Sequence, residues 1–137
     1  MEFRNNFQEL KSQIEYLSSL NKEDVTHIIK SSIYELESLN FLNEEELNEI
    51  NKVTLISEPF NNLFFKYNKE RLINKGVVYI EEKNDLQFII SLFYFFKQRV
   101  PILFHTSSKL QLQFIDILNK LLEENGVSKK FLRKIDE

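Results

Sequence analysis

Three short stretches of this chain hold side chains that can transfer protons or bind anions. The first is Ser57-Glu58, the second runs from Glu81 to Asp85, and the third is His105-Thr106-Ser107-Ser108-Lys109. Each follows an apolar run that is short enough to be a β-strand. In a parallel sheet the carboxyl ends of the strands share one edge, and ligands bind beyond that edge. The three stretches are therefore expected to meet at one rim.

Two kinds of chemistry could use such a rim. In the first, Glu58 or Glu81 acts as a base or a metal ligand, and His105 acts as the matching acid or base. In the second, the helix that follows the third apolar run binds an anion such as phosphate, because free backbone N–H groups gather at a helix N-terminus. The same residues could instead serve the fold alone, as helix caps and as acids that complement a helix dipole. The candidate anion-binding residues are Thr106, Ser107, Ser108 and Lys109.

A second candidate site is an acidic surface. Between Ser31 and Asn51 the chain has six acidic side chains and no basic one. Residues 1–60 carry 12 acids and 5 bases, a net charge of −7, whereas residues 61–137 carry 9 acids and 13 bases, a net charge of +4. A charge run is usually a solvated face, but it can also steer a basic partner toward the protein. The acids are Glu35, Glu37, Glu44, Glu45, Glu46 and Glu49, and Phe41 and Leu42 between them are either an apolar anchor for that partner or a staple between helices.

The apolar pattern predicts the elements that would position these residues. Three continuous apolar runs, at about 53–57, 77–81 and 100–105, have the length of strands that are buried on both faces of a parallel sheet. Helical patterns separate them, which favours right-handed βαβ crossovers. The prediction is an α/β fold with a small three-stranded parallel sheet. The alternative is an all-α bundle in which the three runs are helix ends or loops.

The N-terminal part is predicted to be helical. It should form two helices, the second of them capped by Asn21, and then a short acidic helix that opens with Asn43 and Glu46 in a capping-box arrangement. The first two of these helices should pack on a face or an edge of the sheet. The chain is predicted to be a single domain, with a helical part at 1–51 and a βαβαβα part at 52–137.

Three further helices are predicted between and after the strands. The first should end before Gly76, which is a helix-stop signal. The second, Asp85–Gln98, is capped by Asn84 and is apolar nearly all round, so other elements should cover most of its sides. The third should open at Thr106 or Ser107, and Lys129–Ile135 should add a last helical turn or two.

The composition limits the chemistries that are open to the chain. It has no cysteine, which excludes disulfides and thiolate catalysis, and it has only two histidines and two glycines. It has no alanine, so close approaches between elements must rely on serine, threonine or asparagine. The many residues with AT-rich codons indicate an AT-rich genome or a mobile element. The first residues do not predict a signal peptide, and the longest apolar run is too short to span a membrane. We therefore expect a soluble, cytoplasmic protein.

Three short patterns resemble parts of known families. Residues Asp85–Val127 resemble a unit of the second RecA-like domain of superfamily 2 helicases, which implies a fold unit only, because no Walker motif or arginine finger follows. Glu81-x-Lys83 resembles the E-x-K element of restriction-type nucleases. Asn125-Gly126-Val127-Ser128 is similar to the turn of a helix-turn-helix, although Leu122 stands where that motif takes a small residue.

Together these features favour a non-catalytic protein-binding module that uses the acidic surface, of the kind found in immunity proteins, antitoxins and adaptors. Its partner would be another protein with a basic surface. The alternative is a small-ligand or phosphate-binding enzyme with its site at the C-terminal ends of the strands. No cofactor and no metal site are predicted, no membrane contact is expected, and the net charge of −3 does not favour nucleic acid.

Overall fold

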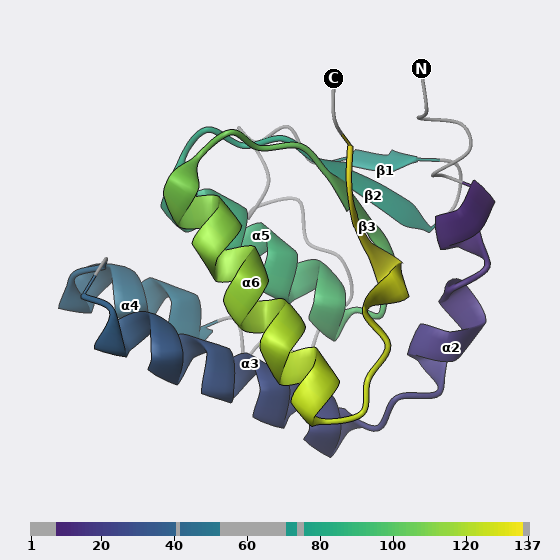
Figure 1. The fold of residues 1–137 in the computed structure, drawn as a ribbon, viewed down its shortest axis with the longest axis horizontal. Coiled ribbons are helices and arrows are strands. Elements are labelled where there is room, and N and C mark those ends of the chain that lie inside the picture. Colours follow the sequence, from purple (N-terminus) through teal and green to yellow (C-terminus); the bar gives the residue numbers. More distant parts are fainter. Residues whose placement is uncertain (1–7, 41, 53–70, 74–75, 136–137) are drawn as a thin grey trace.

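The computed structural model describes residues 8–40, 42–52, 71–73 and 76–135, and the side chains of all of these except 71–73. The fold is α/β, as predicted, and combines one small sheet with helices before and between its strands (Figure 1). The elements in chain order are α2 (Ile14–Ser18), α3 (Lys22–Ser38), α4 (Glu44–Lys52), β1 (Arg71–Ile73), β2 (Val77–Ile80), α5 (Asp85–Lys97), β3 (Ile102–Phe104), α6 (Lys109–Glu124), the 3-10 turn η3 (Lys129–Phe131) and β4 (Leu132–Lys134).

The sheet has the strand order β1-β2-β3-β4. Strands β2, β3 and β4 run parallel, with Val78 opposite Ile102 and Ile102 opposite Leu132, whereas β1 is antiparallel to β2. Strands β2 and β3 confirm the strands predicted near 77–81 and 100–105. The strand predicted at 53–57 lies outside the described residues.

The third parallel strand comes from a segment whose sequence predicts a helical turn. Lys129–Phe131 does form a 3-10 turn, but Leu132–Lys134 then pairs with β3. The prediction of helix for these last residues is wrong, because pairing with a strand far back in the chain outweighs the local amphipathic pattern. A helix-turn-helix is excluded as well, since its second helix would need the residues that form β4.

The edge strand β1 is a second departure from the predicted pattern. The sequence predicts a helix that ends just before Gly76, but Arg71–Ile73 is extended and pairs with β2. Gly76 has φ +121°, a conformation that side chains rarely allow, and it leads directly into β2. Gly76 therefore permits a reversal of direction that a local helix pattern does not predict.

Helices α3 to α6 form two layers on one face of the sheet. Helices α5 and α6 contact each other and lie next to the sheet, and α3 and α4 lie on the outer side of α5 and α6 (Figure 1). Every residue from Phe88 to Phe96 is buried, which confirms the expectation that α5 is covered on most sides. The expectation that the two N-terminal helices pack on the sheet is wrong for α3, which packs on the outer sides of α5 and α6 instead.

Serine fills positions that alanine would take in other proteins. Ser32 on α3 and Ser91 on α5 are both fully buried, and these two helices contact each other. The hydroxyl of Ser32 donates to the carbonyl of Ile28, 2.8 Å away, so its burial leaves no unsatisfied group. The use of serine as the small buried residue agrees with the absence of alanine from the chain.

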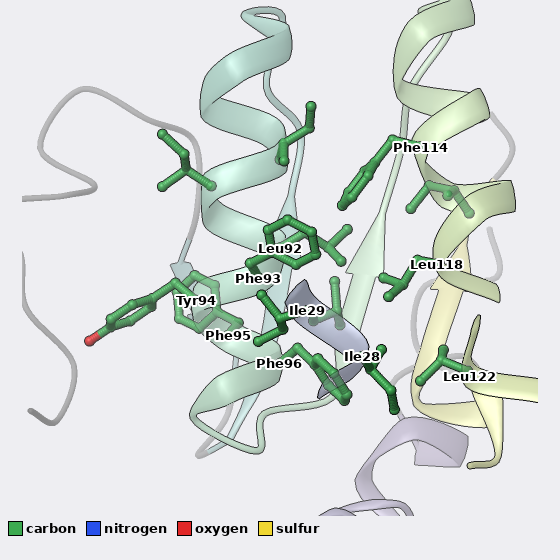
Figure 2. Close-up of a cluster of buried hydrophobic side chains, with 14 of the residues drawn as sticks. Ile28, Ile29, Leu92, Phe93, Tyr94, Phe95, Phe96, Phe114, Leu118 and Leu122 are labelled. Carbon is green, nitrogen blue, oxygen red and sulfur yellow. The ribbon is translucent and has the colours of Figure 1, made fainter. Parts of the chain in front are cut away.

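Aromatic pairs hold the main core together. The ring of Phe93 on α5 meets Phe114 on α6 edge to face, with centroids 5.1 Å apart and an angle of 89° between the planes (Figure 2). Phe96 stacks on Phe131 with centroids 5.2 Å apart. Such pairs add to the stabilisation that comes from burying the rings. A smaller cluster combines Leu10, from the N-terminal segment, with Val77, Leu103 and Ile135, which alternate with the main core along the strands.

Side-chain caps fix where the helices begin. Asn21 and Asn84 accept backbone N–H groups at 2.7 and 2.9 Å, which confirms both as caps of α3 and α5. Helix α6 is capped by Ser108 and not by Thr106 or Ser107 as predicted, because Thr106 instead accepts the backbone N–H of Ser108 at 3.0 Å. Among the described helices, none combines the length and the apolar character that crossing a membrane requires.

Candidate functional site

A pocket of about 260 Å³ opens at the carboxyl ends of β2 and β3. The backbone N–H of His105 donates to the carbonyl of Ile80 over 3.1 Å, so the two strand ends lie side by side. Glu81 and His105 follow these ends directly. The lining residues are Glu81, Glu82, Lys83, His105, Thr106, Ser107, Ser108 and Gln111. This is the edge at which parallel sheets bind ligands.

The pocket brings together most of the residues that the sequence places at the strand rim. Glu81 and His105 share it, and three of the four candidate anion-binding residues line it. The fourth, Lys109, is exposed in the first turn of α6. Glu58 lies outside the described residues, so the catalytic set of Glu58, Glu81 and His105 stays a prediction.

A buried hydrogen-bond network joins the two loops that form the pocket. Gln111 is only 1% exposed, and its Nε2 donates to the carbonyl of Glu82 at 2.8 Å and to Asp85 Oδ1 at 2.9 Å. The same oxygen of Asp85 accepts from the hydroxyl of Ser108 at 2.9 Å, and the hydroxyl of Thr106 donates to Gln111 Oε1. Because these groups satisfy one another, Thr106 and Ser108 hold the loops in place and have little capacity left for a ligand.

Two carboxylates form the wall that follows β2. Glu81 Oε1 accepts from the hydroxyl of Tyr79 at 2.9 Å, and Glu82 Oε1 accepts from the backbone N–H of Asn84 at 3.1 Å. Each of these contacts uses one oxygen of the carboxylate, so the second oxygen can accept from a ligand hydroxyl or amine. In the described part of the chain, no three His, Asp or Glu side chains gather in a way that could hold a metal ion.

The wall that follows β3 carries the imidazole of His105. This side chain is partly buried, and its Nδ1 lies 3.0 Å from the carbonyl oxygen of Ile135. One ring nitrogen is therefore held by the backbone while the ring lines the pocket. A histidine held in this way can accept or donate a hydrogen at its other nitrogen.

The start of α6 brings a basic side chain close to the pocket. Its first turn contains Lys109 and no acid, whereas the first turns of α3, α4 and α5 all contain acids. The partial positive charge of the α6 N-terminus is therefore not offset by side chains of its own first turn, although one oxygen of Asp85, on α5, contacts the cap residue Ser108. The exposed residue Ser107 precedes this turn, and the exposed Lys83 stands on the neighbouring loop.

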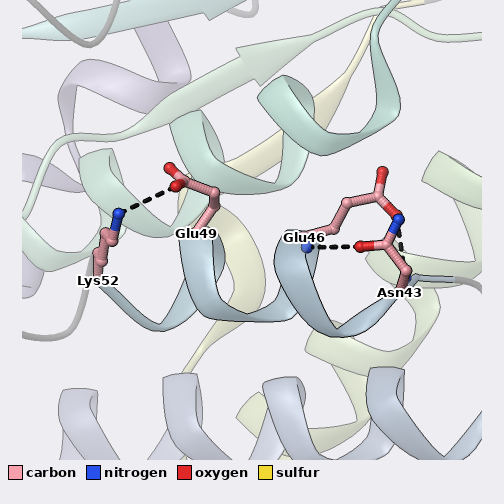
Figure 3. Close-up of polar contacts among 4 residues, drawn as sticks. All are labelled: Asn43, Glu46, Glu49 and Lys52. Atoms are coloured by element: carbon pink, nitrogen blue, oxygen red, sulfur yellow. Dashed lines mark hydrogen bonds and ion pairs between the residues drawn. The ribbon is translucent and has the colours of Figure 1, made fainter.

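Half of the predicted acidic surface is engaged in contacts within the chain. Glu46 and Asn43 form the predicted capping box, with the Glu46 N–H 2.8 Å from Asn43 Oδ1 and the Asn43 N–H 3.0 Å from Glu46 Oε1 (Figure 3). Glu49 pairs with Lys52 at 3.0 Å. Glu35 Oε1 lies 3.8 Å from Lys120 Nζ, which makes a second ion pair.

The rest of the acidic surface is open to solvent. Glu37, Glu44 and Glu45 are exposed. Leu42 is partly buried and packs against the main core, which makes it part of the contact between helices, whereas Phe41 lies outside the described residues. Two large apolar side chains are exposed in the described part of this stretch, Tyr34 with 74% and Leu39 with 42% of its area accessible. The docking role of the surface stays a prediction.

Sequence reasoning missed two groups that build the pocket. The first is Gln111, although Ser108-x-x-Gln111 matches the capping-box pattern and could have indicated both residues. In the structure the Gln111 side chain contacts Asp85 and Glu82 across the pocket. The second is the carbonyl of Ile135, for which the sequence gives no signal, because it follows a strand that the local pattern does not predict.

A function for the pocket or for the acidic surface has to be derived from their own side chains. No protein-family model, no curated protein and no solved structure matches this chain.

Proposed function

We propose that the strand-end pocket binds a small ligand that carries a phosphate group together with hydroxyl or amine groups. The observation that supports this function is a single pocket that joins the start of α6 to Glu81, Glu82 and His105. One side of the pocket suits an anion and the other side suits hydrogen-bond donors. A phosphorylated sugar, polyol or amino alcohol has both kinds of group.

The phosphate is proposed to bind at the start of α6. Ser107 and Lys109 offer a hydroxyl and an ammonium group there, beside the backbone N–H groups of the first turn. The network of Gln111, Asp85 and Ser108 fixes this turn against the loop that follows β2. The anion site would therefore be formed before the ligand arrives, which lowers the entropic cost of binding.

The uncharged part of the ligand is proposed to bind between the two strand ends. Glu81 and Glu82 present carboxylate oxygens there, and His105 presents a ring nitrogen. Hydroxyl and amine groups donate to such acceptors, and a charged acceptor strengthens the hydrogen bond. The carboxylates would repel a bare dianion placed beside them, so the phosphate is expected on the α6 side only.

Glycerol phosphate is expected to stabilise the protein against thermal unfolding. At a concentration of 100 times its Kd, a ligand that binds only the folded state adds about 2.7 kcal/mol. The double variant Ser107→Ala and Lys109→Gln should weaken binding by about tenfold or more, because charge-assisted hydrogen bonds to the phosphate are lost. Calorimetric titration and thermal unfolding both measure the effect.

A matched control uses a lysine away from the pocket. Lys129→Gln removes one exposed positive charge from the 3-10 turn and should leave the affinity nearly unchanged. Equal losses of affinity in the control and in the double variant would mean that the protein attracts phosphate only through its general charge. No stabilisation by any phosphate ester would contradict the proposed function.

Docking of a basic protein on the acidic surface is a second proposal, in the class of immunity, antitoxin and adaptor proteins. The observation that favours it is the exposed Leu39, which follows Glu37 closely in the chain. An apolar residue with acids around it can serve as an anchor while the charges guide the approach. Helix α4, which contacts α3, adds the exposed Glu44 and Glu45.

Reversing two charges tests this docking surface. Glu44→Lys with Glu45→Lys should reduce the capture of a basic partner from a lysate of the source organism, and more strongly at low salt, because screening is then weak. Glu46 is kept because it caps α4. The control, Glu15→Lys on α2 with Glu123→Lys on α6, makes the same change of charge on exposed residues outside the acidic surface. Equal capture by both double variants would exclude docking at α4.

A further inference from the structure

The C-terminal strand reaches the pocket through a backbone carbonyl. Ile135 follows β4, and its N–H donates to the carbonyl of Phe104 over 2.8 Å while its own carbonyl oxygen lies 3.0 Å from His105 Nδ1. The side chain of Ile135 is 4% exposed and belongs to the smaller core cluster. The sheet and the core therefore both fix the position of the carbonyl that faces His105.

This contact determines where the imidazole carries its hydrogen. A carbonyl oxygen can only accept a hydrogen bond, so Nδ1 must be the donor. A neutral imidazole has a single N–H, and its other nitrogen, Nε2, then has a free lone pair. Histidine in water favours the opposite tautomer, in which the hydrogen is on Nε2. The contact with Ile135 thus selects the tautomer that is the less populated one in solution.

We infer that Ile135 is a positioning residue for the pocket. Its carbonyl holds neutral His105 as the Nδ1–H tautomer, so that Nε2 accepts a hydrogen bond from the ligand. Because Nδ1 is occupied by the strand, Nε2 is the ring nitrogen that remains for a ligand. The part of this inference that concerns the ligand rests on the proposed function and narrows it. A fully ionised phosphate has no hydrogen to donate, so Nε2 binds a hydroxyl or amine of the ligand and not its phosphate.

The tautomer can be measured without any ligand. The chain has two histidines, and His27 is exposed on α3, so it serves as an internal reference. Long-range ¹H–¹⁵N correlation spectra, recorded at a pH where both imidazoles are neutral, should show Nδ1–H for His105 and mainly Nε2–H for His27. The variant His105→Gln assigns the signals. A wild-type His105 that carries its hydrogen on Nε2 overturns the inference.

Two substitutions near the end of the chain test the part played by the strand. Ile135→Ser removes a buried apolar side chain and should shift His105 toward the Nε2–H tautomer, whereas Lys134→Ser changes an exposed neighbour and should leave Nδ1–H in place. If Ile135→Ser does not fold, the milder Ile135→Ala replaces it. An unchanged Nδ1–H tautomer in a folded variant whose backbone amide at this position exchanges freely with solvent would overturn the inference.

Two phosphate esters test the part played by the ligand. Glycerol phosphate and methyl phosphate carry the same charged group, but only glycerol phosphate has free hydroxyls. The wild type should bind glycerol phosphate about tenfold more tightly, which corresponds to one hydrogen bond. The variant His105→Phe should lose the share of this preference that Nε2 supplies and still bind methyl phosphate, whereas Glu81 and Glu82 remain as acceptors for the other hydroxyl.

The outcomes separate this inference from the proposed function. Equal affinity of the wild type for the two esters would overturn the inference and leave phosphate binding in the pocket intact. Binding of neither ester would overturn the proposed function and the ligand part of the inference together. The imidazole spectra would then decide on their own whether Ile135 sets the tautomer of His105.

Discussion

Phe93→Ala is expected to lower the free energy of unfolding by about 3–5 kcal/mol, the usual cost of truncating a buried phenylalanine. Phe93 has no exposed area, and it loses its edge-to-face contact with Phe114 when the ring is removed. Helix α5 lies between the sheet on one side and α3 and α4 on the other, so the surroundings cannot collapse into the space. Because domains of this size are stable by about 5–15 kcal/mol, the loss is a large share of the total.

Chemical denaturation measures this loss. The midpoint in urea should fall while the slope of the transition stays constant, since the slope reflects the surface exposed on unfolding. Tyr34→Ala is the matched control, because Tyr34 is an aromatic residue of α3 that is 74% exposed, and its change should stay within about 0.5 kcal/mol. If Phe93→Ala lowered the free energy of unfolding by a similarly small amount, α5 would be less tightly packed than its burial indicates.

Gln111→Leu is expected to cost roughly 3 kcal/mol and to weaken ligand binding in the pocket. The substitution keeps a side chain of similar size but removes the hydrogen bonds to Glu82, Asp85 and Thr106. Buried polar groups that lose their partners pay the full cost of desolvation, which is larger for a charged group such as Asp85. The bond from Ser108 to Asp85 still joins the loops after β2 and β3, but Gln111 no longer fixes the first turn of α6 against them, so the anion site is less well preformed.

The same helix offers a close control for this substitution. Gln113 is exposed two residues further along α6, and Gln113→Leu should change stability by less than about 0.5 kcal/mol and leave ligand affinity intact. Denaturation and calorimetric titration of the two variants separate stability from binding. If Gln111→Leu is as stable as Gln113→Leu, the buried network adds no net stability and serves only to fix the conformation of the two pocket loops.

The parts of the fold that were predictable are those set by local sequence. Strands β2 and β3 are continuous apolar runs, and α5 is apolar all round, so their apolar pattern alone predicts burial on both sides. The asparagine caps follow from the hydrogen-bonding capacity of a single side chain. Strands β1 and β4 were not predictable, because Arg71 in β1 and Arg133 and Lys134 in β4 interrupt any apolar run, and only pairing with a neighbour makes them extended.

The same division applies to the pocket. Topology alone brings Glu81 and His105 together, because both follow neighbouring parallel strands. The role of Gln111 depends on which side chain reaches across from one loop to another, and no local spacing encodes that choice. The partner of His105 is a backbone carbonyl, which every residue possesses, so the sequence offers no mark to distinguish Ile135. The sequence shows the cluster of acids directly, but it does not show that Glu49 pairs with Lys52 and Glu35 with Lys120.

The enclosure of α5 has a consequence for how the molecule opens. Amide hydrogens exchange with solvent when their segment detaches, and peripheral segments can do so while the remainder stays folded. Helix α5 has the sheet on one side and other helices around it, so its amides become accessible only when the layers separate. The slowest-exchanging amides of the protein should therefore lie in α5, and their exchange rates would give the free energy of global unfolding directly.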